Sequence, residues 1–167
     1  MGREQWTVEI VRSHRRRKTV QASQHGDTIR VYMPANMSRA DEEKWVDEML
    51  GRLERRERRE RASAEIDLTE RARLLSARHF DGELRPATIR WVANMNDRHG
   101  SCTPVDGAIR LSHVLAEFPD WVRDYVIVHE LAHLRVPDHS SYFWELVRRY
   151  PYAERARGYL IAKGMEE

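Results

Sequence analysis

Residues 124–144 read Asp-Tyr-Val-Ile-Val-His-Glu-Leu-Ala-His-Leu-Arg-Val-Pro-Asp-His-Ser-Ser-Tyr-Phe-Trp and contain the pattern His-Glu-x-x-His. Residues four apart on an α-helix share a face, so His129 and His133 should point their imidazole rings the same way. Two imidazoles placed in this way can bind one Zn²⁺ as neighbouring ligands. Glu130 lies beside the first histidine, where its carboxylate can act as a general base on water at the metal. The stretch therefore predicts a metal-binding helix with hydrolytic chemistry.

A catalytic zinc site needs a third protein ligand and keeps one position open for water. Pro137 should end the helix soon after His133, because proline has no N–H and clashes with the preceding turn. The chain can then turn and bring His139 back toward the metal, so this histidine is the first candidate for the third ligand. Glu145, on a helix expected to begin near Ser140, is the second candidate, because sites of the His₂Glu type take a carboxylate from a later helix.

The residues just before the motif are apolar on nearly every side, which predicts a buried helix. They are Trp121, Val122, Tyr125, Val126, Ile127 and Val128. Two histidines and a glutamate on a buried helix are costly unless they are paired or bound to a metal. A hydrogen-bonded polar core would also satisfy them, but the spacing favours the metal site.

Several further pieces of sequence accompany the motif. They are Gly100-Ser101-Cys102, Ala108-Ile109-Arg110-Leu111, residues 125–134 and His139-Ser140-x-x-Phe143-Trp144. With them, the run from Trp91 to Tyr150 resembles the YgjP-like metal-dependent hydrolases, relatives of the SprT-like and minigluzincin metallopeptidases. Residues 13–34 resemble the opening β segment of that family. The resemblance implies one Zn²⁺ per chain bound by His129, His133 and His139, with Glu130 as the catalytic base.

Two positions depart from the family pattern. His99 stands where the family usually has Trp before Gly-Ser-Cys, and Ser112-His113 stand where an Asn usually follows the next strand. We expect these changes to spare the metal ligands and to affect substrate preference. His99 and His113 are either ordinary polar residues or substrate contacts. The candidate substrate-binding residues are Arg98, His99, His113 and Tyr142.

The composition restricts the class of protein. The 167 residues carry 29 basic and 27 acidic side chains, so the formal charge of +2 gives no overall case for nucleic-acid binding. Cys102 is the single cysteine, which is typical of a reducing compartment. No apolar run approaches the length of a membrane span. These features predict a cytoplasmic protein without a membrane segment.

The chain is expected to form one domain with three segments: an N-terminal β segment (1–37), a charged helical segment (38–80) and a zinc-binding core (86–167). Alternating residues predict three strands in a small antiparallel sheet, at 6–11, 19–23 and 28–33. A capping box at Ser38 predicts the start of a helix, and further helices are expected at 69–79 and 152–161. Strands at 88–93 and 108–112 should pair antiparallel across a functional loop, 94–106.

The predicted fold is α+β, with a small antiparallel or mixed sheet, a zincin-type active-site helix and flanking helices. We expect a zinc metallopeptidase that acts on peptides or proteins, with an extended substrate paired to a sheet edge. One alternative is a metal-dependent hydrolase of nucleotide phosphates, with Arg12–Lys18 holding the phosphates. Another is a non-catalytic binding module with structural zinc, against which Glu130 argues, because a closed zinc site needs no carboxylate beside water.

Overall fold

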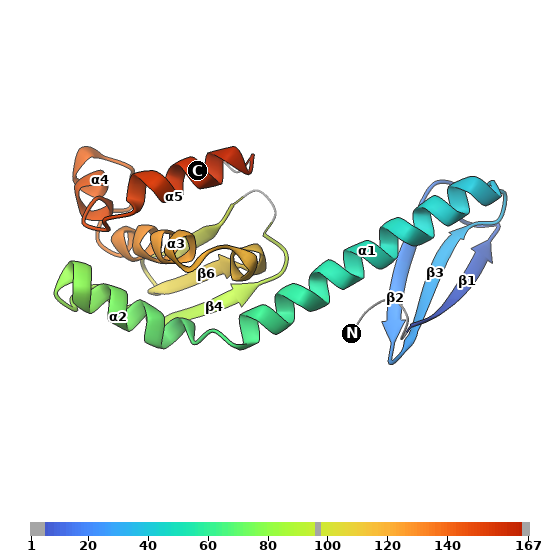
Figure 1. Ribbon diagram of the computed structural model, residues 1–167, viewed down its shortest axis with the longest axis horizontal. Helices are drawn as coiled ribbons and strands as arrows, with labels where there is room; N and C mark the ends of the chain where they lie inside the picture. The colour runs from blue at the N-terminus through green and yellow to red at the C-terminus, as the bar shows by residue number, and fades with distance from the viewer. Residues whose placement is uncertain (1–5, 96–97, 165–167) are drawn as a thin grey trace. The chain divides into compact units, whose positions relative to one another are not determined.

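The computed structural model describes residues 6–95 and 98–164. The chain divides into two compact units, residues 1–58 and 59–167. Helix α1 (Arg39–Ala64) begins in the first unit and ends in the second. Each unit contains a three-stranded sheet, and helices accompany both sheets, so the predicted α+β class is confirmed (Figure 1). The expectation of a single domain stays a prediction.

The sheet of the first unit contains β1 (Thr7–Ser13), β2 (Gln21–His25) and β3 (Thr28–Pro34) in the order β1-β3-β2. β2 and β3 form an antiparallel hairpin whose turn contains Gly26 at φ +61°. β1 pairs parallel to β3, so the prediction of an antiparallel sheet is wrong for this pair. The fully buried side chains of β3 explain its central place, because the strand with the most apolar inward face is best covered between two neighbours.

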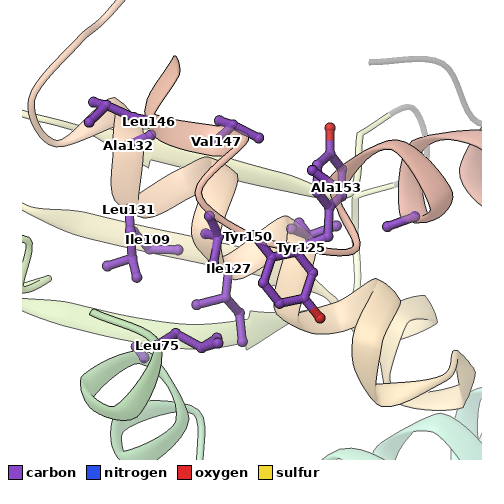
Figure 2. Packing of buried hydrophobic residues seen from close by; sticks show 14 of the residues in the cluster. Leu75, Ile109, Tyr125, Ile127, Leu131, Ala132, Leu146, Val147, Tyr150 and Ala153 are labelled. Carbon is purple, nitrogen blue, oxygen red and sulfur yellow. The ribbon is translucent and has the colours of Figure 1, made fainter. Parts of the chain in front are cut away.

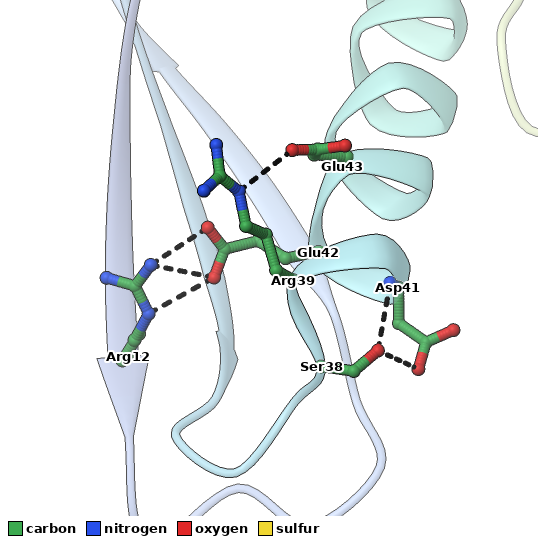
Figure 3. A network of polar contacts seen from close by, with 6 residues as sticks. All are labelled: Arg12, Ser38, Arg39, Asp41, Glu42 and Glu43. Carbon is green, nitrogen blue, oxygen red and sulfur yellow. Dashed lines mark hydrogen bonds and ion pairs between the residues drawn. The ribbon is translucent and has the colours of Figure 1, made fainter.

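Helix α1 begins where the capping box predicts. The Ser38 hydroxyl accepts a hydrogen bond from the Asp41 N–H (3.1 Å) and donates one to the Asp41 carboxylate (2.7 Å; Figure 3). The basic run Arg12–Lys18 spans the end of β1 and the connection to β2, and Arg12 forms an ion pair with Glu42 (2.8 Å). The apolar stripe of α1 packs on β3 in a small core that includes Trp45, Met49, Leu50, Leu53, Ile29, Val31 and Met33.

After the end of α1, the second unit continues with α2 (Leu68–Phe80), close to its predicted bounds. The Asp67 carboxylate accepts a hydrogen bond from the Glu70 N–H, and Asp81 ends the helix in the left-handed region at φ 54°. Three strands follow: β4 (Thr88–Val92), β5 (Gly100–Thr103) and β6 (Ala108–Ser112).

The second sheet has the order β4-β6-β5, with β4 parallel and β5 antiparallel to β6. The predicted antiparallel pairing of the strands at 88–93 and 108–112 is therefore wrong. The segment expected to be a loop contains β5, which forms a hairpin with β6 and leaves the opposite edge of β6 to β4. β5 consists of Gly-Ser-Cys-Thr, and such small residues give a weak strand signal in a sequence.

Helix α3 (Asp120–His133) carries the motif and ends at His133, shortly before Pro137. Helices α4 (Ser141–Val147) and α5 (Ala153–Ala162) follow, near the predicted positions. Figure 2 shows side chains from α2, β6, α3 and α4 in one apolar cluster, including Leu75, Ile109, Ile127 and Leu146. This core surrounds α3 and fixes where its polar side chains emerge. Among the described residues, no helix is both long and apolar enough to cross a membrane.

Candidate active site

Three imidazole rings converge at the C-terminal end of α3. Nε2 of His129 lies 3.2 Å from Nε2 of His133 and 3.3 Å from Nε2 of His139. One ring nitrogen from each residue lies within 4.8 Å of the other two, so the group could hold a metal ion. We call His129, His133 and His139 the histidine cluster. Glu145, the other predicted candidate for the third ligand, is exposed on α4 and does not belong to this group.

A tight turn after α3 brings His139 back to the helix. Nδ1 of His133 lies 3.0 Å from the carbonyl oxygen of Val136. A carbonyl oxygen only accepts, so Nδ1 carries the proton and Nε2 directs its lone pair at the other two rings. At the end of the turn, the Ser140 N–H donates to the Asp138 carboxylate at 3.2 Å. A backbone carbonyl behind the ring is the usual means of orienting a histidine ligand.

Aromatic side chains of α4 hold the three rings in place. The ring of Phe143 stacks on His133 with 4.4 Å between centroids and lies 4.8 Å from both His129 and His139. Phe143 is fully buried. The indole of Trp144 stacks on His139 at 5.6 Å. The cluster therefore rests on an apolar support that limits rotation of each imidazole.

The electrostatics favour neutral histidine. Burial, and then the charges of His133, His139 and His99, lower the pKa of His129 from 6.5 to about 3. His129 is thus a neutral imidazole at physiological pH and need not lose a proton when a metal binds. Three imidazole nitrogens on one side of a cavity fit a divalent transition metal such as zinc, and they leave a coordination position for water or substrate.

The histidine cluster opens into a pocket of about 510 Å³. Glu130 lines this pocket and is only 5% exposed. The remaining wall comes from the segment around β5, from α3, from the proline turns and from α5: Arg98, His99, Gly100, Ser101, Cys102, Pro104, Tyr125, Val126, Pro137 and Leu160. A carboxylate and three convergent imidazoles in one concave site are a typical arrangement for metal-assisted hydrolysis.

Residues 57–162 match the profile of the YgjP-like metallopeptidase domain. The chain belongs to the YgjP-like family. It is therefore a metal-dependent peptidase. Among solved structures, the crystal structure of the metallopeptidase zymogen abylysin from Pyrococcus abyssi is similar, with 24% identity and a TM-score of 0.49, over 60% of this chain and 95% of that chain. No curated protein matches the sequence significantly.

The YgjP-like site includes two of the four predicted substrate-binding residues. Arg98 and His99 line the pocket, and His99 is buried close enough to His129 for its charge to affect that pKa. His113 and Tyr142 are not part of the pocket lining. Nδ1 of His113 instead lies 3.2 Å from the Ser63 hydroxyl, and Tyr142 is 47% exposed on α4.

Sequence reasoning assigned no role to several residues that line this YgjP-like pocket. Leu160 comes from α5, far along the chain, and nothing but its apolar character marked it. Cys102 faces the same space; burial, and then the charge of Glu130, raise the pKa of its thiol to about 11. This thiol is consequently protonated at neutral pH and a poor metal ligand. Gly100 lines the pocket beside Glu130, and only its place in the Gly-Ser-Cys motif pointed to it.

Proposed function

We propose that this chain is a zinc-dependent peptidase in which His129, His133 and His139 bind Zn²⁺ and Glu130 is the general base. The observation that carries the proposal is the convergence of three Nε2 atoms in a pocket that also contains the buried Glu130 carboxylate. When bound, Zn²⁺ polarises the scissile carbonyl and lowers the pKa of a coordinated water toward ~7.

In this proposal Glu130 transfers a proton from the attacking water to the leaving amine. Its carboxylate lines the same pocket as the histidine cluster, on the helix that carries His129 and His133, but is not one of the convergent ligands. It can therefore accept a proton from the attacking water and deliver it to the nitrogen of the leaving amine. Burial of Glu130 excludes bulk water from this transfer and keeps the proton between base and substrate.

Strand β5 supports a peptide as the substrate. β5 is an edge strand of its sheet, and Gly100, Ser101 and Cys102 line the pocket. An edge strand presents unpaired N–H and C=O groups, which an extended peptide can pair with irrespective of its sequence. Arg98 and His99 are the residues proposed to contact the substrate near the cleaved bond, and the proposal leaves out His113 and Tyr142.

The pocket gives less support to nucleotide hydrolysis than to peptide hydrolysis. Polyphosphate substrates are held by several arginine or lysine side chains or by a backbone cradle. Among the described residues that line the pocket, Arg98 is the one arginine or lysine.

Metal ligation is tested by the zinc content of purified variants. His133→Ala removes one of three ligands, so elemental analysis should find the zinc lost. His25→Ala, which changes an exposed histidine of the first unit, is the matched control and should retain close to one zinc per chain. Full zinc content in His133→Ala would contradict the assignment.

The role of Glu130 is tested by hydrolysis of casein by zinc-loaded protein. Glu130→Gln keeps the shape of the side chain but removes the base, so the rate should fall at least ~10²-fold while zinc content persists. Glu145→Gln makes the same chemical change on the exposed face of α4 and should leave both unchanged. Nucleoside triphosphates belong in the same assay, and their turnover in place of casein would favour the nucleotide alternative.

A further inference from the structure

Gly100 lies against the side chain of Glu130. A β-carbon built on Gly100 would lie 2.8 Å from both Cγ and Cδ of Glu130, and closer still to Oε1. Non-bonded carbon atoms pack at ~3.5–4.0 Å. No residue with a side chain can therefore occupy position 100 while the Glu130 carboxylate keeps its present place.

Backbone conformation does not explain this glycine. The described glycines with positive φ are Gly26, Gly82, Gly107 and Gly164, so Gly100 lies outside the left-handed region. It pairs with Leu111 in the sheet, where any residue could adopt the backbone geometry. Glycine weakens a strand and often marks a close approach of another group to the backbone. Position 100 therefore requires glycine because glycine has no side chain, and not because of its backbone freedom.

We propose that Gly100 is a positioning residue for Glu130. The absence of a β-carbon lets the carboxylate lie against the edge strand β5, inside the pocket that it shares with the histidine cluster. The inference rests on the proposed function, in which Glu130 is the base. It also gives a physical role to the first residue of the Gly-Ser-Cys motif, which metal ligation leaves unexplained.

The consequence of adding a side chain follows from which atoms collide. They belong to the outer part of the Glu130 side chain and not to the backbone of α3. The carboxylate should therefore turn into the pocket while the helix and the histidines stay in place. Restoring a contact of ~3.5 Å requires a movement of roughly 0.7 Å or more. A misplacement of about 1 Å in a reacting group can cost ~10² in rate.

The test compares Gly100→Ala with Gly158→Ala in the full chain loaded with zinc. Gly158 is exposed on α5, and a β-carbon there meets nothing within 4 Å, so it is a matched glycine-to-alanine control. Gly100→Ala should lower kcat for casein by about 10- to 100-fold, with KM, zinc content and thermal midpoint near those of the wild type. Gly158→Ala should match the wild type in kcat, KM and zinc content, with a thermal midpoint at or slightly above that of the wild type, because alanine favours a helix more than glycine does. An unchanged kcat in Gly100→Ala would overturn the proposal.

A double-mutant cycle shows whether Gly100 acts through Glu130. In the Glu130→Gln background the position of the base no longer matters, so Gly100→Ala should reduce the residual rate no further. Losses that multiply would overturn the proposal, because Gly100 would then act on another step, such as substrate pairing with β5.

A crystal structure of Gly100→Ala gives a readout that does not depend on turnover. The Glu130 carboxylate should be displaced, with the histidine cluster unmoved. A carboxylate that keeps its place beside the added methyl group would contradict the inference whatever the rate. Full activity of the single variant Glu130→Gln would instead refute the proposed function, and the displacement in the crystal would still test the packing at Gly100.

Discussion

Replacing Phe143 by leucine should weaken metal binding as well as destabilise the fold. The Phe143 ring contacts all three rings of the histidine cluster at centroid distances of 4.4–4.8 Å. Leucine fills much of the same buried volume but has no ring face for the imidazoles. The rings should consequently sample more orientations in the metal-free state, and binding must then restrict them.

The expected magnitudes come from burial and ring contacts. A hydrophobic exchange of similar volume costs up to about 1.5 kcal/mol, and each of the three contacts with an imidazole ring adds ~0.5–1.5 kcal/mol, so Phe143→Leu should lose roughly 1.5–6 kcal/mol of unfolding free energy. Residues that orient metal ligands typically contribute ~10- to 100-fold to metal affinity. The assays are urea unfolding of the metal-free protein and zinc titration against a competing chelator.

Phe80→Leu is the matched control. Phe80 is 1% exposed and belongs to the same apolar core, but it has no ring contact with the histidine cluster among the described residues. It should lose up to about 1.5 kcal/mol of unfolding free energy, the cost of the change in side-chain shape, and keep the wild-type zinc dissociation constant. Equal zinc affinities in Phe143→Leu and Phe80→Leu would refute the reasoning.

Three further predictions concern the core and the pocket. Arg71→Met should destabilise the protein by about 2 kcal/mol in urea unfolding, which is more than the loss expected for Asp124→Asn. The Asp124 side chain left behind in Arg71→Met is only 7% exposed, whereas the Arg71 side chain left behind in Asp124→Asn is 40% exposed and can turn to water. The metal-free protein should lose about 1.4 kcal/mol of stability per unit as pH falls from 6.5 toward 3, since His129, with its pKa lowered to about 3, binds a proton only when unfolded. His129→Gln should reduce that slope in unfolding measured at pH 7, 6 and 5. Cys102, with its pKa raised to about 11, should react with iodoacetamide at pH 8 roughly 100-fold more slowly than an unperturbed thiol. Glu130→Gln should speed the reaction, and an unaltered rate would place Glu130 too far away to act on the thiol.

Local signals predicted the helices well. Ser38 caps α1 as its capping box indicates, and α2 spans Leu68–Phe80, close to the predicted 69–79. α3 stops before Pro137 and the chain turns at once. Caps and breakers act within a few residues, so the sequence alone contains the information that decides them.

Strand pairing was predicted less well because it depends on competition between distant segments. β6 can take an antiparallel partner from either side, and the adjacent β5 takes one edge through a short turn. Nothing within residues 88–93 shows that another segment competes to pair with β6. The small residues of β5 give a weak strand signal, so the sequence did not predict β5 as that competing strand. The parallel pairing of β1 with β3 has the same origin.

The residues of the candidate site also differ in whether a local sequence pattern predicts them. The spacing of His129, Glu130 and His133 on one helix gave their proximity directly, and the turn at Pro137 pointed to His139. Leu160 reaches the pocket only through the packing of α5, which no local pattern specifies. The approach of Glu130 to the backbone at position 100 likewise requires the sheet and α3 to be docked.

A crystal structure of the zinc-loaded protein tests the central claim most directly. We expect one zinc ion per chain, identified by anomalous scattering at the zinc edge, with Nε2 of His129, His133 and His139 each at ~2.0–2.1 Å. A zinc ion bound through Glu145 with His139 turned away, or a zinc ion outside the histidine cluster, would contradict that claim.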